Sequence, residues 1–191
     1  CKLCRLTFFT FEDFASYDAL HFHDIFKMPF NAASINFPIS YFFSLMHLNA
    51  RSLIGNFDKF EILLANLRKW FSVIGVTETW LNDLTSELVN MPGYSFVSNH
   101  RKSKIGGGIG LNLKNNLQYK ICSEWTYSNP DVIESVFVEI NVPHGKNIVV
   151  GVMYRPPNQN TAVFIDELND ILINITRGNK LCYIMGNFNL D

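Results

Sequence analysis

The sequence predicts an α/β fold in which two mixed β-sheets pack face to face and helices cover the outside. Two observations carry this prediction. Hydrophobic periodicity indicates few but long helices and many strands, and several of those strands follow one another directly. Doubly wound folds alternate strand and helix, which this chain does not. Its 191 residues, 48% of them hydrophobic, are enough for one domain with a sizeable core.

The first 42 residues are predicted to be an irregular, aromatic-rich segment. They hold many of the 17 phenylalanines, and Pro29 and Pro38 interrupt any regular element. Cys1 and Cys4 could supply two of the four ligands that a tetrahedral zinc site needs. The segment is therefore either a linker with two incidental thiols or the remnant of an upstream zinc module. The regular domain is predicted to run over residues 43–191.

A strand and a helix open the predicted domain. Residues 43–49 form an apolar run typical of a buried strand, and i, i+3, i+4 spacing predicts a helix over residues 57–71. Asn56 is expected to cap this helix, and Asp58 suits its first turn. The apolar face of the helix comprises Phe60, Leu63, Leu64, Leu67, Trp70 and Phe71.

Strands dominate the rest of the domain. Residues 73–77 are short and apolar, as in a sheet covered on both faces. A second helix is predicted over residues 162–175, with Thr161 as its cap and Gly178 as its C-terminal stop. The other strands are predicted at residues 94–98, 108–113, 117–121, 133–140, 148–154 and 181–185.

Composition restricts the partners and the compartment. The net charge of −1 provides no global positive field, so contact with nucleic acid would have to be local. The four cysteines form no disulfide framework, which favours an intracellular location, nuclear or cytoplasmic. The longest apolar stretch, residues 37–48, is too short and interrupted for a span of about 20 residues, so no membrane partner is expected.

Polar residues gather at the C-terminal ends of four buried strands, where layered α/β proteins often bind ligands. The four groups are Asn49, residues 77–80, residues 154–157 and residues 186–191. Each also has a plain structural explanation. Asn49 could cap a turn, and Glu78 could be a solvated acid. Tyr154 could lie at the edge of the core, and Gly186 with Asn187 is a common turn pair.

Together, six segments resemble motifs of the endonuclease/exonuclease/phosphatase family, and specifically of the endonucleases of non-LTR retrotransposons. They are LMHLNARSL (45–53), VIGVTETWL (73–81), GGGIGLNL (106–113), IESVFVEI (133–140), VGVMYRPPN (150–158) and IMGNFNLD (184–191). The resemblance implies a four-layer α/β sandwich and Mg²⁺-dependent hydrolysis of phosphodiesters in target DNA. It also implies DNA as the partner and a reverse transcriptase domain in the same polyprotein.

The resemblance assigns roles to individual residues. Asn49 matches an Asn that orients the site, and Glu78 matches the metal-binding Glu. One carboxylate is enough to anchor Mg²⁺, which keeps several of its waters. Tyr154 matches a Tyr that approaches the scissile phosphate. Asn189 matches the Asn of a Gly-Asp-Phe-Asn motif, and Asp191 matches an acid that often follows it.

Two departures from the family pattern predict an inactive chain. Position 187 is Asn where the family has the Asp that activates the attacking water, and an amide is not a useful base. The family also continues through further strands to a Ser-Asp-His motif, so the sandwich is expected to be incomplete at its C-terminus. None of the five histidines matches that motif. The missing strands would leave one sheet short, with an open edge.

A basic patch precedes three consecutive glycines. Arg101, Lys102 and Lys104 form either a solvated loop or a phosphate contact beside the site. Residues 106–108 lack the Gly-Lys-Ser/Thr of a phosphate-binding loop. They are instead expected to let a strand start close to a neighbouring segment.

Three functions stay open at this point. An inactive endonuclease of a non-LTR retrotransposon is favoured. A second interpretation is a nucleic-acid-binding remnant without catalysis. A third is another phosphoesterase of the same superfamily, acting on a phospholipid head group or an inositol phosphate. The segments TETW (77–80) and YRPP (154–157) favour the retroelement endonuclease over that third interpretation.

Overall fold

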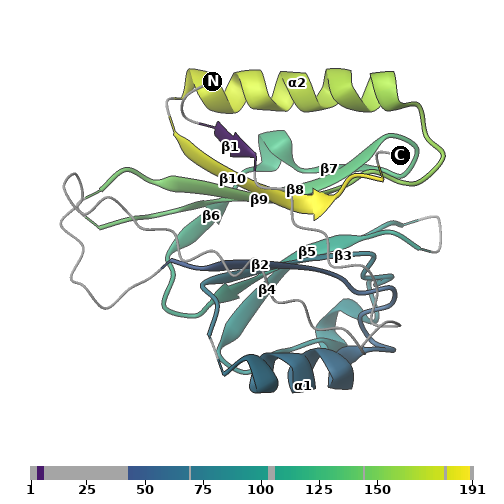
Figure 1. Cartoon of the computed structure of the whole chain (residues 1–191), viewed down its shortest axis with the longest axis vertical. Helices are drawn as coiled ribbons and strands as arrows, with labels where there is room; N and C mark the ends of the chain where they lie inside the picture. The colour runs from purple at the N-terminus through teal and green to yellow at the C-terminus, as the bar shows by residue number, and fades with distance from the viewer. Residues whose placement is uncertain are drawn as a thin grey trace.

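The computed structural model describes residues 4–6, 43–68, 70–102, 106–143, 145–178 and 180–189. Figure 1 shows four layers, in which α1 and α2 lie on the outside of two facing sheets. The elements, in chain order, are β1 (Cys4–Leu6), β2 (Leu45–Asn49), α1 (Phe57–Leu67), β3 (Val73–Thr77), η1 (Ser86–Leu88), β4 (Tyr94–Asn99), β5 (Ile109–Lys114), β6 (Tyr119–Ile121), η2 (Ser123–Trp125), β7 (Tyr127–Asn129), β8 (Ile133–Ile140), β9 (Ile148–Tyr154), α2 (Thr161–Arg177) and β10 (Leu181–Asn187).

Both sheets are mixed. The smaller sheet has the order β2-β3-β5-β4, with β2 and β3 parallel and β5 antiparallel to both of its neighbours. The larger sheet has the order β1-β10-β9-β8-β6, with β7 also paired to β8; β1, β10 and β9 are parallel, and β8 runs antiparallel to β9. The predicted four-layer α/β sandwich with helices outside is confirmed.

Apolar packing between and outside the sheets holds the layers together. The central cluster takes fully buried residues from both sheets, among them Val73, Leu111, Val150 and Val152. Phe60 anchors α1 to the outer face of the smaller sheet, and Phe164 anchors α2 to the outer face of the larger sheet. Burial of this kind contributes most of the favourable free energy of folding.

The first helix is shorter than the predicted span of residues 57–71. It ends at Leu67 because Arg68 takes a left-handed φ of 48°, which stops the helical turn. Phe71 is buried beyond the helix, but Trp70 is 65% exposed. The Trp70 ring stacks on Tyr94, with 6.2 Å between the ring centroids. The predicted apolar face was therefore right as far as Leu67 and wrong for Trp70.

The predicted N-terminal caps are wrong for both helices. Asn56 occupies the cap position of α1, but its amide donates to main-chain oxygens of the preceding turn, so its side chain caps nothing. Asn160 caps α2 in place of Thr161, because its extended backbone lets its Oδ1 accept from the N–H of Ala162 at 2.9 Å. Gly178 ends α2, as predicted.

The predicted irregular segment contains one strand. Cys4–Leu6 forms β1, which pairs with β10 in the register Cys4↔Cys182. The prediction is therefore wrong for these three residues, and β1 lies along the side of β10 not covered by β9. Cys1 and residues 7–42 lie outside the described part of the chain, so the zinc interpretation stays a prediction. β10 itself runs to Asn187, two residues beyond the predicted end at residue 185.

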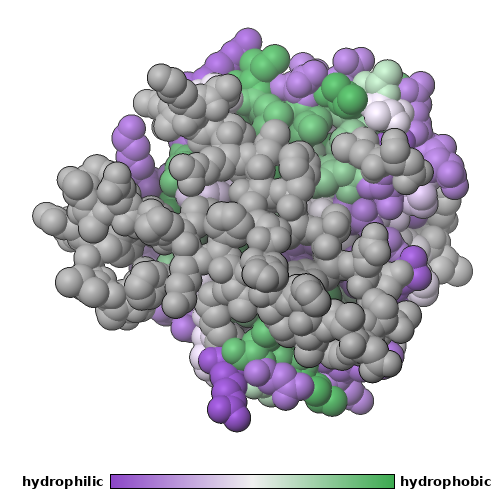
Figure 2. Space-filling model, viewed as in Figure 1, coloured by the Kyte–Doolittle hydropathy of each residue, from purple (hydrophilic) through white to green (hydrophobic). Residues whose placement is uncertain are grey.

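The outer surfaces of the helices are partly apolar. Figure 2 shows apolar side chains reaching the surface over the two helical layers, at the top and bottom of the view. On α2 the exposed large hydrophobic residues are Val163, Ile165 and Ile173. In the described part of the chain, neither helix is both long enough and apolar enough to cross a membrane.

A buried carboxylate stabilises one end of the larger sheet. Glu139 of β8 is 5% exposed, and its carboxylate accepts from Lys180 Nζ at 2.8 Å and Asn147 Nδ2 at 2.9 Å. Lys120 Nζ lies 3.0 Å from the same carboxylate. Burial alone would raise the pKa of Glu139, but the hydrogen bonds from Lys180, Asn147 and Lys120 lower this pKa to about 2.

Glu139 should make the stability depend on acid pH. Because its folded pKa of about 2 lies below its ordinary value of 4.5, its contribution is complete above pH 4.5 and is lost as the pH falls towards 2. We expect Glu139→Gln to flatten this part of the dependence. The measurement is urea unfolding at a series of pH values from 6 down to 2. An equally steep loss of unfolding free energy in Glu139→Gln would contradict the assignment.

Candidate functional site

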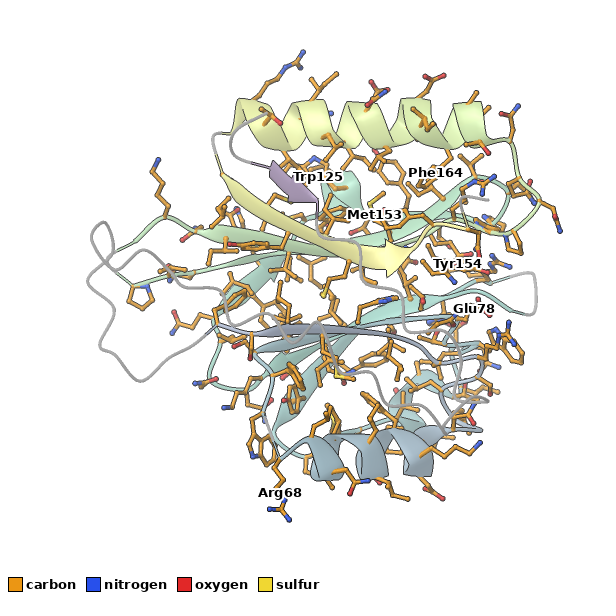
Figure 3. All side chains as sticks on the ribbon, in the orientation of Figure 1. Arg68, Glu78, Trp125, Met153, Tyr154 and Phe164 are labelled. Atoms are coloured by element: carbon orange, nitrogen blue, oxygen red, sulfur yellow. The ribbon has the colours of Figure 1, made fainter. Side chains whose placement is uncertain are left out.

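The carboxylate of Glu78 joins the two sheets at one edge of the sandwich. Glu78 directly follows β3 of the smaller sheet, and its Oε1 accepts from Asn49 Nδ2 at 2.9 Å. From the larger sheet, the Tyr154 side chain lies close enough to this carboxylate for the negative charge of Glu78 to raise the Tyr154 pKa. Figure 3 shows Glu78 and Tyr154 facing one another between the two sheets. The structure thus brings together three of the residues predicted from strand ends.

Parallel pairing of β2 and β3 brings Asn49 and Glu78 together. The register places Asn49 opposite Thr77, so both strands end at the same level. The following loops remain bonded, because the N–H of Ser52 donates to Glu78 O at 2.9 Å. Glu78 itself has a left-handed φ of 52°, which is unfavourable for a residue with a Cβ and often marks a functional site.

Tyr154 is the last residue of β9, and its side chain is buried. Burial raises its pKa most strongly, and the negative charges of Glu78 and Glu134 raise it further, although Arg101 opposes them. The hydroxyl therefore keeps its proton at neutral pH. A protonated hydroxyl can donate a hydrogen bond to a neighbouring anion.

Asn187 and Asn189 lie at the same edge of the sandwich. Asn187 ends β10 opposite Tyr154, and its Oδ1 accepts from the N–H of Asn189 at 3.2 Å. Asn189 Nδ2 donates to the main-chain oxygen of Arg155 at 2.5 Å. The structure thus brings both predicted residues beside Tyr154, where their hydrogen bonds join them to each other and to Arg155. Asp191 lies outside the described residues.

Arg155 is a structural residue of this site that the sequence analysis did not single out. Its buried guanidinium donates to the main-chain oxygens of Phe188, Asn189 and Gln159, and to Thr161 Oγ1 at 2.8 Å. It thereby ties the end of β10 to the loop before α2. The available signal was an arginine between an apolar strand and two prolines, in the segment YRPP.

Of the basic patch predicted from Arg101, Lys102 and Lys104, the structure describes Arg101 and Lys102. The Arg101 side chain is only 7% exposed and makes an ion pair with the buried carboxylate of Glu134. Lys102 is exposed, and Lys104 lies outside the described residues. The solvated-loop interpretation is therefore wrong for Arg101, and the phosphate contact stays a prediction. The signal for its partner was Glu134, an acidic residue near the start of the largely apolar segment IESVFVEI.

The three glycines let the start of β5 approach the Glu78 loop, as predicted. Gly108 has a φ of 79°, and a Cβ on it would lie 2.6 Å from Thr79 Oγ1. The N–H groups of Thr79 and Trp80 donate to the carbonyls of Gly108 and Gly107 at 3.1 and 2.9 Å. Glycine is required because a side chain would separate these two segments.

The oxygen atoms around Glu78 suit a hard cation. Asn49 Oδ1 is buried and accepts no hydrogen bond within the described part of the chain. It belongs to the amide whose nitrogen holds the Glu78 carboxylate. No group of three or more His, Cys, Asp or Glu side chains that could hold a metal occurs among the described residues. The Glu78 carboxylate and the Asn49 amide oxygen are donors of the kind that an ion such as Mg²⁺ takes, since it needs only one or two carboxylates.

The two histidines among the described residues lie beside a threonine and an aspartate. His47 is buried, with its Nε2 3.2 Å from Thr77 Oγ1. His100 Nε2 lies 2.8 Å from Asp83 Oδ1. His21, His23 and His144 lie outside the described residues.

Solved structures with this arrangement of layers exist. No protein-family model matches the sequence, and no curated protein matches it. An endonuclease/exonuclease/phosphatase family protein of Bacteroides thetaiotaomicron aligns with a TM-score of 0.52 at 13% identity, over 78% of this chain and 64% of that one. The chain has the endonuclease/exonuclease/phosphatase fold.

Three further structures, two of TDP2 and one of a phosphatase, share this fold. Humanized TDP2 of D. rerio aligns with a TM-score of 0.56 at 15% identity, over 78% of this chain and 67% of that one. TDP2 of D. rerio complexed with a single-strand DNA product gives 0.50 at 14%, over 73% and 55%. A mannosyl-6-phosphatase of Bacteroides thetaiotaomicron gives 0.52 at 13%, over 77% and 64%. The chain thus spans about two thirds or less of their lengths.

Gly108→Ala tests the close approach at the Glu78 loop. We expect it to lower the unfolding free energy by about 2–4 kcal/mol, because a left-handed φ and a clash with Thr79 act together. Gly93→Ala is the matched control, since Gly93 has a φ of 85° and its Cβ would meet only a Trp70 ring atom at 3.5 Å. Urea unfolding measures both. Equal losses in the two variants would contradict the steric part of the argument.

Proposed function

We propose that this chain is an endonuclease domain of the kind found in non-LTR retrotransposon proteins, which binds a divalent cation and DNA phosphodiesters but does not cleave them. The observation that carries the proposal is the Glu78 carboxylate, which accepts from Asn49 Nδ2 and lies beside Tyr154 of the larger sheet. A preorganised carboxylate at a strand end is the minimum that a phosphate-bridging cation needs.

Each residue of this site would have a separate task. Glu78 and the free Oδ1 of Asn49 would hold the cation, and Mg²⁺ in such a position neutralises charge on a phosphodiester. The Asn49 amide nitrogen keeps the Glu78 carboxylate in place. The protonated Tyr154 hydroxyl would orient that carboxylate and, when displaced by a ligand, donate to a phosphate oxygen.

Loss of hydrolysis is proposed from position 187. The resemblance places a water-activating Asp there, but this chain has Asn187, whose Oδ1 already accepts from the N–H of Asn189. A missing general base typically costs about 10²–10⁴ in rate. Glu134, another carboxylate at this edge, is engaged with Arg101 and the N–H of Gly108. It therefore does not offer a replacement base.

DNA is the proposed ligand for two reasons. The segments TETW (77–80) and YRPP (154–157) resemble retrotransposon endonucleases, and a DNA product is bound to D. rerio TDP2, which shares the fold. A reverse transcriptase in the same polyprotein is part of this proposal. The same fold in a mannosyl-6-phosphatase keeps a different phosphoesterase as the alternative. A nucleic-acid-binding module that needs no cation is the other alternative.

Glu78→Gln tests the proposal through binding and not through turnover. We expect the wild-type chain to bind a fluorescently labelled DNA duplex more tightly with Mg²⁺ than with EDTA. Glu78→Gln should lose about tenfold of that Mg²⁺-dependent affinity, because one charged cation ligand is removed. Fluorescence anisotropy at fixed ionic strength measures the effect. Supercoiled plasmid should stay intact with either protein.

Glu61→Gln provides the matched control, since Glu61 is an exposed residue of α1 on the far side of the smaller sheet. It should bind DNA like the wild type. DNA binding that is unaffected by EDTA and by Glu78→Gln would favour the cation-independent module. Mg²⁺-dependent nicking that Glu78→Gln abolishes would overturn the proposed inactivity.

A further inference from the structure

Glu134 connects the two sheets beside the Glu78 site. It is 1% exposed and lies in β8 of the larger sheet, opposite Tyr154 in the antiparallel register. Its Oε2 accepts from the N–H of Gly108 at 2.5 Å, and its Oε1 accepts from the guanidinium of Arg101. Arg101 and Gly108 both belong to the segment between β4 and β5 of the smaller sheet. One buried carboxylate thus holds that segment against the larger sheet.

The segment held by Glu134 in turn holds the Glu78 loop. The carbonyls of Gly108 and Gly107 accept from the N–H groups of Thr79 and Trp80, the two residues after Glu78. Glu78 and Trp80 both have left-handed φ values, 52° and 54°. Such backbone conformations persist only where surrounding contacts impose them. These two hydrogen bonds are contacts of that kind.

Charge at this place is balanced inside the protein. Burial raises the pKa of Glu134, and the Arg101 charge and the Gly108 N–H oppose that increase. Arg101 and Glu134 thus form a nearly neutral pair next to Glu78 and Tyr154. If either partner were missing, the other would leave an uncompensated charge in a buried place.

We infer that Glu134 and Arg101 are positioning residues of the site. Their ion pair fixes the glycine segment, and this segment holds the backbone of Glu78 in its left-handed conformation. The ion pair also keeps the charge beside Glu78 nearly neutral. Neither residue needs to touch a ligand. The effect on the backbone follows from the contacts alone, whereas the effect on cation binding rests on the proposed function.

Hydrogen exchange tests the positioning role without any ligand. In Glu134→Ala, the amides of Gly108, Thr79 and Trp80 should exchange about tenfold or more faster than in the wild type, because their segment loses its anchor. Residue-resolved NMR measures this. Glu139→Ala is the matched control, since it removes a buried, ion-paired carboxylate from the other end of the same strand. It should leave those three amides unchanged relative to the rest of the chain.

The inference fails if the three amides exchange at wild-type rates in Glu134→Ala, or if Glu139→Ala accelerates them equally. Should Glu134→Ala not fold, Glu134→Gln takes its place. Its amide oxygen still accepts from Gly108, but Arg101 loses its charged partner. For this variant, acceleration of the Gly108, Thr79 and Trp80 amides over those of β8 supports the inference, and uniform rates overturn it.

Terbium binding separates this inference from the proposed function. Tb³⁺ is a hard, oxygen-seeking probe, and its luminescence can be excited through aromatic side chains. Glu134→Gln should weaken Tb³⁺ binding about tenfold, because Arg101 then stands near the cation with its charge uncompensated. Equal affinity in wild type and Glu134→Gln would overturn the charge part of the inference and leave the proposed function intact. A wild type that binds no Tb³⁺ would overturn the cation site, while hydrogen exchange still decides the positioning role.

Discussion

The site depends on one constraint: a single carboxylate has to lie between two sheets. Glu78 directly follows β3 of the smaller sheet, and Tyr154 of the larger sheet lies beside its carboxylate. The sheets stay in register because their facing surfaces are apolar and close-packed, to the point that Gly75 would bring a Cβ within 3.0 Å of Met185. Any change in sheet spacing therefore changes the geometry around Glu78. In this fold, the packing of the core therefore determines the arrangement of the site.

The strand β8 shows how the protein places two buried carboxylates for different purposes. Glu139 lies at one end of β8, where its carboxylate contacts two lysines and an asparagine and so joins neighbouring segments of the larger sheet. Glu134 lies five positions earlier, and its carboxylate reaches the smaller sheet, where its partners are one arginine and one main-chain N–H. Both are satisfied, which offsets the desolvation that burial costs. Only Glu134 lies next to the candidate site, beside Glu78 and Tyr154.

Sequence periodicity was sufficient to predict the layers of the fold. It was not sufficient to predict features that depend on tertiary contacts, such as the burial of Arg101. Apolar runs placed most strands within a few residues, because burial on both faces leaves a strong signal. Motif positions brought Asn49, Glu78 and Tyr154 together correctly, since strands that end at one edge carry their next residues to the same place. Arg101 could not be placed this way: a cationic run in a glycine-rich loop has the composition of a solvated segment. Its burial depends on Glu134, which is remote in sequence.

The loop after β10 explains how a site could lose its chemistry and keep its shape. Asn187 accepts from the N–H of Asn189, a task that a carboxylate oxygen would perform equally well. Arg155 binds the carbonyls of that loop, which do not change with the side chain at position 187. Replacing Asp by Asn at such a position removes basicity without removing a structural hydrogen bond. Under the proposed function, binding would therefore outlast hydrolysis, because the side chain at position 187 can lose its basicity while the loop after β10 keeps its hydrogen bonds.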